Sequence, residues 1–121
     1  MKVKILSVKD VGIVNEERII LEVTEECNIG KYLIAITHYV SGDNSISVVQ
    51  KGSYFFPNLQ VKKGDWVVLY TKNGTESEKK NSDGTTSYFY FWGLSAENLT
   101  KENDCFVLIE VNTWKTVIRK K

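Results

Sequence analysis

The chain has 121 residues, 42% of them hydrophobic and 26% charged, a balance that indicates a folded globular protein and excludes an intrinsically disordered one. At this length we expect a single domain, residues 1–121, with enough core to fold without disulfides or structural metals. The formal charge of +1, from 16 basic and 15 acidic residues, gives no overall field that attracts phosphate polymers or anionic membranes. Nucleic-acid binding would therefore need a local basic patch.

The N-terminal segment lacks the pattern of a secretion signal, because Ile5 and Leu6 are followed at once by Ser7 instead of a longer apolar run. No stretch has the length and apolar character of a membrane span. We therefore expect a cytoplasmic protein with no membrane partner. Without a secretion signal, Cys27 and Cys105 are expected to be two separate, small apolar side chains, and their pairing in a disulfide stays open.

The first half of the chain predicts short strands separated by polar turns. Arg18–Val23 alternates, with Ile19, Leu21 and Val23 on one side, a period of two that is typical of a half-buried strand. Three further segments rich in β-branched and aromatic residues are also expected to be strands: residues 3–8, 32–40 and 46–49. The polar segment between the last two, residues 41–44, is expected to be a turn.

The centre of the chain predicts the strand around which the fold is built. Lys62–Asp65 is a polar turn that contains a glycine, and Trp66–Tyr70 follows it as an unbroken apolar run. Such a run is too short for a buried helix and indicates a strand covered on both faces.

A long polar segment, Thr71–Ser87, separates this strand from an aromatic one. It carries no apolar side chain to bury, so we expect a flexible hairpin whose tip extends into solvent. In the following five aromatic residues, alternation places Tyr88, Tyr90 and Trp92 on one face and the other two on the opposite face.

The C-terminal part predicts one helical turn and a hairpin. Ser95–Leu99 has the composition of a single capped turn, and Cys105–Val111 that of a strand. Asn112-Thr113 would turn the chain into a last strand at Trp114–Arg119. In total we expect about eight or nine short strands and no amphipathic helix, which is the pattern of an all-β sandwich or barrel.

This order of features resembles the lamin tail domain, a module of nuclear lamins and of many bacterial proteins. The matching features are Tyr54-Phe55-Phe56-Pro57, the Val61–Trp66 turn with its strand, and later Glu102-Asn103-Asp104 with another strand. The most specific of them is the block from Phe56-Pro57 to Leu69, and the rest is general β patterning. The resemblance implies an all-β, antiparallel immunoglobulin-like β-sandwich that serves as a non-catalytic binding or assembly module.

The ionisable residues do not form a recognisable catalytic pattern. His38 is the single histidine, and its neighbours in the chain are not a nucleophile-and-acid pair. The pairs Glu16-Glu17 and Glu25-Glu26 are expected to be solvated turn charges, since adjacent residues of a strand point to opposite faces. We therefore predict no enzyme activity, no catalytic residues, no metal site and no cofactor.

Two binding hypotheses remain. The preferred one is a protein partner or a homo-oligomer that contacts an exposed aromatic face made of Tyr88, Tyr90 and Trp92. The same flat rings would also suit a carbohydrate. The alternative is nucleic acid, because single strands need basic side chains beside stacking aromatics. The basic candidates are Lys62, Lys63, Lys79, Lys80 and Arg119–Lys121.

Overall fold

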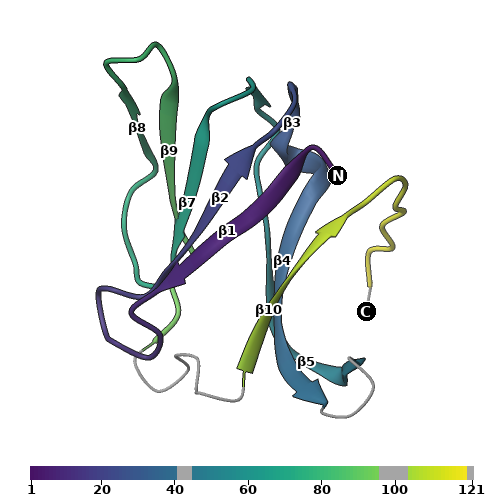
Figure 1. Ribbon diagram of the computed structural model, residues 1–121. Coiled ribbons are helices and arrows are strands. Elements are labelled where there is room, and N and C mark those ends of the chain that lie inside the picture. The colour runs from purple at the N-terminus through teal and green to yellow at the C-terminus, as the bar shows by residue number, and fades with distance from the viewer. Residues whose placement is uncertain (41–44, 96–103, 120–121) are drawn as a thin grey trace.

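The computed structural model describes residues 1–40, 45–95 and 104–119, with the backbone alone for residues 39–51 where they fall in these ranges (Figure 1). The described residues form ten strands and one 3-10 turn, η1 (Ile29–Lys31), with no α-helix. The strands are β1 (Val3–Lys9), β2 (Arg18–Val23), β3 (Cys27–Asn28), β4 (Tyr32–Val40), β5 (Ser45–Phe55), β6 (Gln60–Val61), β7 (Trp66–Tyr70), β8 (Ser77–Lys80), β9 (Thr86–Phe91) and β10 (Asp104–Glu110).

The strands form three sheets, of which two make a sandwich. A five-stranded sheet has the order β1-β2-β7-β9-β8, a three-stranded sheet the order β10-β4-β5, and β3 pairs with β6. The two larger sheets lie on opposite sides of the molecule in Figure 1, and residues of both supply one hydrophobic core. The predicted all-β, sandwich-like fold is therefore confirmed.

The predicted central strand is β7, which has the expected bounds and lies in the middle of the five-stranded sheet. Val67 and Leu69 are fully buried and point into the core, so Trp66, Val68 and Tyr70 lie on the outer face. One neighbour, β2, pairs with β7 in the predicted antiparallel sense.

The other neighbour, β9, pairs with β7 in parallel, which differs from the all-antiparallel arrangement that the sequence predicts. Parallel neighbours need a long crossover connection. Here residues 71–85 supply it. They pass the far end of β9, run antiparallel to β7 as β8, and then turn back into β9, which lies between β8 and β7. The polar segment therefore determines the direction of the aromatic strand.

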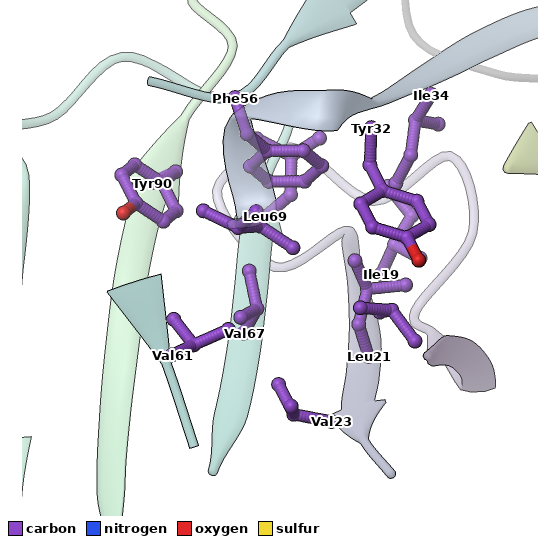
Figure 2. Packing of buried hydrophobic residues seen from close by; sticks show 12 residues of the cluster. Ile19, Leu21, Val23, Tyr32, Ile34, Phe56, Val61, Val67, Leu69 and Tyr90 are labelled. Carbon is purple, nitrogen blue, oxygen red and sulfur yellow. The ribbon is translucent and has the colours of Figure 1, made fainter. Parts of the chain in front are cut away.

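Side chains from both sheets meet in the core, as Figure 2 shows. Ile19 and Leu21 of β2 and Leu69 of β7 point toward the same interior as Tyr32 and Ile34 of β4. The alternation predicted for Arg18–Val23 is confirmed by this arrangement, because its apolar residues are the buried ones. The predicted strand at 46–49 and the start of the aromatic-Pro segment belong to one long strand, β5.

The predicted C-terminal hairpin is wrong. Residues 111–119 contain no strand, and Trp114, Val117 and Ile118 are 63%, 84% and 80% exposed. The Asn112-Thr113 turn lacks the glycine that favours a tight hairpin, which leaves β10 paired with β4 alone. The turn expected at 41–44, most of the helical turn expected at Ser95–Leu99 and most of the Glu102–Asp104 turn lie outside the described residues.

Candidate functional site

The face of β9 that was expected to be exposed points into the sandwich. Register pairs Tyr90 with Leu69 of β7, and Tyr90 is only 4% exposed. Its ring centroid lies 5.5 Å from that of Phe56 in an edge-to-face arrangement. Tyr88 and Trp92 are partly buried against the same core, and Trp92 lies 5.9 Å from Tyr54 between ring centroids. The prediction of an exposed face is therefore wrong for Tyr90, because this side of β9 faces the interior of the sandwich. Tyr88 and Trp92 also belong to the inner side but are intermediate in exposure.

Burial also changes the acidity of the inner tyrosines. Loss of water around its ring, helped by the negative charge of Glu76, raises the pKa of Tyr90 to about 12. Burial likewise raises the pKa of Tyr54. These phenols are held in their neutral form, as is expected of core residues.

The outer face of the same sheet carries an apolar row that the sequence-based search did not single out. Ile20 of β2 pairs with Val68 of β7, which in turn pairs with Phe89 of β9. Next to this row lies Trp66, on the same face of β7. Val68 is 9% exposed, whereas Ile20, Phe89 and Trp66 are only partly buried. In a sandwich the outer face is ordinarily polar, so this row is the first candidate binding surface.

One end of the outer face is closed by its own side chains. Tyr70 and Phe91 stack with 5.4 Å between ring centroids and 12° between planes. The cations of Arg18 and Lys72 lie 5.8 and 5.0 Å from the Tyr70 centroid. Gly74 packs so closely on the Phe91 ring that a Cβ atom there would clash with it. The flat ring faces are thus occupied here, and the accessible part of the face is its centre.

Charged side chains border the outer face, and the basic ones are in excess. Lys4 pairs with Glu22 across β1 and β2 at 3.3 Å, and Arg18 pairs with Asp10 at 2.9 Å. The register of the sheet adds three lysines to the same face or its edge: Lys9, Lys72 and Lys79.

The tip of the polar hairpin is exposed as predicted and contains several internal hydrogen bonds, whereas Thr71 and Thr86 near the two ends of the segment are buried. All four residues of β8 are exposed. At the tip, the Asn81 amide Nδ2 donates to Thr85 Oγ1 at 3.1 Å and to Ser87 Oγ at 3.0 Å. Asp83 Oδ1 accepts from the Thr85 backbone N–H at 3.0 Å. A positive φ of 89° at Gly84 completes the turn.

The predicted basic residues do not form one patch. Lys62, Lys63 and Lys80 line one hollow of about 230 Å³, together with Tyr88. Lys79 pairs with Ser87 and lies on the opposite face of the hairpin. Of the C-terminal basic residues, Arg119 is exposed and the last two lie outside the described part of the chain.

The lone histidine has a partner that sequence reasoning missed. His38 of β4 is opposite Asp104 of β10, and its Nδ1 lies 3.0 Å from Asp104 Oδ1. The two are far apart in the sequence, so only the strand pairing brings them together. A histidine and a carboxylate are two members of an acid–base arrangement.

Glu17 departs from the expectation of a solvated turn charge, since it is 1% exposed. Its Oε2 accepts from the Gly12 backbone N–H at 2.6 Å, which closes the loop between β1 and β2. Glu16, Glu25 and Glu26 are exposed, as predicted.

Cys27 and Cys105 are both unpaired thiols in the structure, in agreement with the expectation. Burial raises the pKa of each thiol. Within residues 1–40, 45–95 and 104–119, no three His, Cys, Asp or Glu side chains come together in a way that could hold a metal ion. The described part of the chain also contains no helix of the length and apolarity that crossing a membrane requires.

Comparison with known proteins does not assign a family: no protein-family model matches the chain, and no curated protein is significantly similar in sequence. The resemblance to lamin tail domains therefore stays a prediction.

Proposed function

We propose that this chain is a non-catalytic protein-binding domain and that its partner docks on the outer face of the five-stranded sheet. The observation that supports this most is the apolar row Ile20–Val68–Phe89, with Trp66 beside it, on a face that a sandwich normally leaves polar. The lamin-tail resemblance, with its implied role as an interaction module, agrees with this proposal.

The chemistry of the row favours a protein surface over a sugar. Its centre is aliphatic and tightly packed, with Val68 at 9% exposure between Ile20 and Phe89. A sugar platform needs accessible flat rings, and the stacked pair Tyr70 and Phe91 covers its own ring faces. A central apolar patch with an anchoring Trp or Phe and a charged border is the usual composition of a protein interface.

The charges at the border favour a different protein over a second copy of this chain. The carboxylates of Glu22 and Asp10 are paired within the sheet, whereas Lys9, Lys72 and Lys79 add positive charge. Two copies facing each other would bring these lysines together, which costs energy. We therefore expect a partner with an apolar centre and acidic residues around it.

The test begins with a photo-reactive benzoyl-phenylalanine placed at Ser87, which lies beside Trp66 on the outer face. The same group at exposed Ser53, on β5 of the three-stranded sheet, is the control. The partner that cross-links from position 87 is then purified, and its affinity is measured by calorimetry against the unlabelled chain and its variants.

We expect Trp66→Thr or Phe89→Thr to weaken that affinity by about 30-fold, the usual effect of an interface anchor. Phe55→Thr is the matched control, because Phe55 is a 58% exposed aromatic residue on the other sheet, and it should change the affinity less than about twofold. No adduct at position 87, equal adducts at both positions, or equal loss in Phe55→Thr would reject the outer face as the binding surface.

A further inference from the structure

Two turns meet at the end of the five-stranded sheet where β7 and β9 begin, at the top of Figure 1. One is the Lys62–Asp65 turn before β7, and the other is the hairpin turn before β9. At Gly64, which has a φ of 91°, a Cβ atom would lie 3.2 Å from Thr85 Cγ2, so the two turns are in contact. The hollow between them holds three lysines that are separate in the sequence, Lys62, Lys63 and Lys80.

Asp65 holds the two turns in a fixed relation. It is 5% exposed, its Oδ2 accepts from the Lys62 backbone N–H at 2.8 Å, and its Oδ1 accepts from the Thr86 backbone N–H at 2.9 Å. The same turn is joined to β2, since the Gly64 N–H donates to the Val23 carbonyl at 2.9 Å. The frame that carries the lysines is therefore built in advance of any ligand, which lowers the entropy lost on binding.

The carboxylates near the lysines leave positive charge available. Asp65 is engaged by two backbone donors, as described. Lys80 Nζ donates to Thr86 Oγ1 at 3.3 Å and lies 3.6 Å from Glu78 Oε2. That ion pair is exposed, with side chains at 79% and 55%, so it is weak and an incoming anion can compete for the ammonium group. Lys62 and Lys63 are exposed beside it.

The surroundings limit the anion to one charged group. On the other side of Tyr88 lies a second hollow of about 330 Å³, which Glu76 and Glu78 border. A nucleic-acid strand carries a phosphate at every residue and needs a continuous basic track, which these two carboxylates interrupt. A single phosphoryl group needs only this local group of three lysines, and Tyr88 lines the same hollow.

We propose that this end of the sheet is a binding pocket for one phosphoryl group of a phosphomonoester, held by Lys62, Lys63 and Lys80, with the esterified group against Tyr88. The pocket lies on the inner side of β8 and β9, whereas the proposed protein-binding row lies on their outer side. Failure of one proposal in its test therefore leaves the other unaffected.

The test is a titration of the full chain with phenyl phosphate at fixed ionic strength, followed by the amide resonances of the folded protein. We expect saturable shifts at residues 62–65 and 84–86, and weaker binding of inorganic phosphate, which has no group to place on Tyr88. Shifts that stay linear to about 50 mM would overturn the proposal, because a dissociation constant above this concentration does not indicate a specific site. Equal shifts for phenyl phosphate and for the carboxylate phenylacetate would overturn it too.

Adjacent lysines on one strand provide matched variants. Lys80→Gln removes a charge from the pocket and should weaken phenyl phosphate about fivefold, whereas Lys79→Gln removes the same charge from the opposite face and should change affinity less than about twofold. Glu78→Gln should strengthen binding, because it removes the anion that competes for Lys80. Equal losses in the two lysine variants would show a general charge effect and overturn the pocket.

An oligonucleotide separates the polymer from the single group. A single-stranded oligonucleotide without terminal phosphate should bind more weakly than phenyl phosphate, and adding a 5′-phosphate should restore binding. Tighter binding of the unphosphorylated strand would overturn the single-phosphoryl proposal in favour of a nucleic-acid groove. All these substitutions are at exposed side chains, and the amide spectrum of each variant reports directly whether the fold is retained.

Discussion

The two faces of the five-stranded sheet carry similar side chains in different surroundings. On the inner face, Leu69 is fully buried and Tyr90 is 4% exposed, because the three-stranded sheet covers them. On the outer face, Trp66 and Phe89 come from the same two strands and are only partly buried. The comparison teaches that an aromatic strand does not itself reveal its exposed side. The register with its neighbour decides which half becomes core and which half faces outward.

The largest expected effect tests the inner face. Leu69→Ala should lower the free energy of unfolding by about 3 kcal/mol, since it removes a fully buried side chain in the middle of the core and leaves a cavity. Urea unfolding followed by tryptophan fluorescence measures this. A loss below about 1 kcal/mol would mean that the two sheets do not pack on this face as described.

A smaller effect on the free energy of unfolding should depend on pH and arise from ionisation of Tyr90. The unfolded phenol ionises near pH 10, whereas the folded one does so at about 12, so the neutral form is stabilised in the fold. This stability is fully present below pH 10 and is lost as the pH rises toward 12, on the order of 1–2 kcal/mol.

Urea unfolding at pH 8, 10 and 11 measures that loss, and Tyr90→Phe should show less of it than the wild type. Part of the loss remains in the variant, because burial also raises the pKa of Tyr54. Identical pH profiles for the two proteins would contradict the inward position of the Tyr90 ring.

The smallest expected effect on stability belongs to the outer face. Phe89→Thr keeps a residue that suits a strand and removes a ring that is only partly buried, so the free energy of unfolding should fall by about 1 kcal/mol or less. Under the proposed function, the same variant should weaken partner binding by about 30-fold, so its effect on binding would far exceed its effect on stability. A loss as large as that of Leu69→Ala would show that another part of the chain covers Phe89.

Much of the fold followed from local patterns. The period-two pattern of Arg18–Val23 and the apolar run Trp66–Tyr70 predicted strands β2 and β7 with their observed bounds. The composition of Thr71–Ser87 predicted an exposed hairpin, and β8 is exposed throughout. These features depend on neighbouring residues alone, which is why one sequence is enough to find them.

The candidate sites depend on pairing between distant segments and could not be found in this way. The sequence predicts an exposed Tyr90 because the register that places it beside buried Leu69 is not visible in either strand. Lys63 and Lys80 line the same hollow because Asp65 connects their two turns. His38 lies opposite Asp104 because of the β4–β10 register. The sequence did contain one signal for the outer face. Trp66 and Tyr70 occupy alternate positions of β7, and Phe89 and Phe91 occupy alternate positions of β9, which indicates a second aromatic face.

The insertion of β9 between β7 and β8 has a consequence for the order of assembly during synthesis. Until residues 86–91 have left the ribosome, one edge of β7 has no partner, because the intervening β8 pairs with β9 and not with β7. A nascent chain that ends at the hairpin tip thus exposes the unpaired backbone of the most apolar strand in the protein, the kind of edge that promotes association between chains. The charged, polar stretch that directly follows β7 emerges at this stage, and charged residues next to an unpaired edge oppose such association.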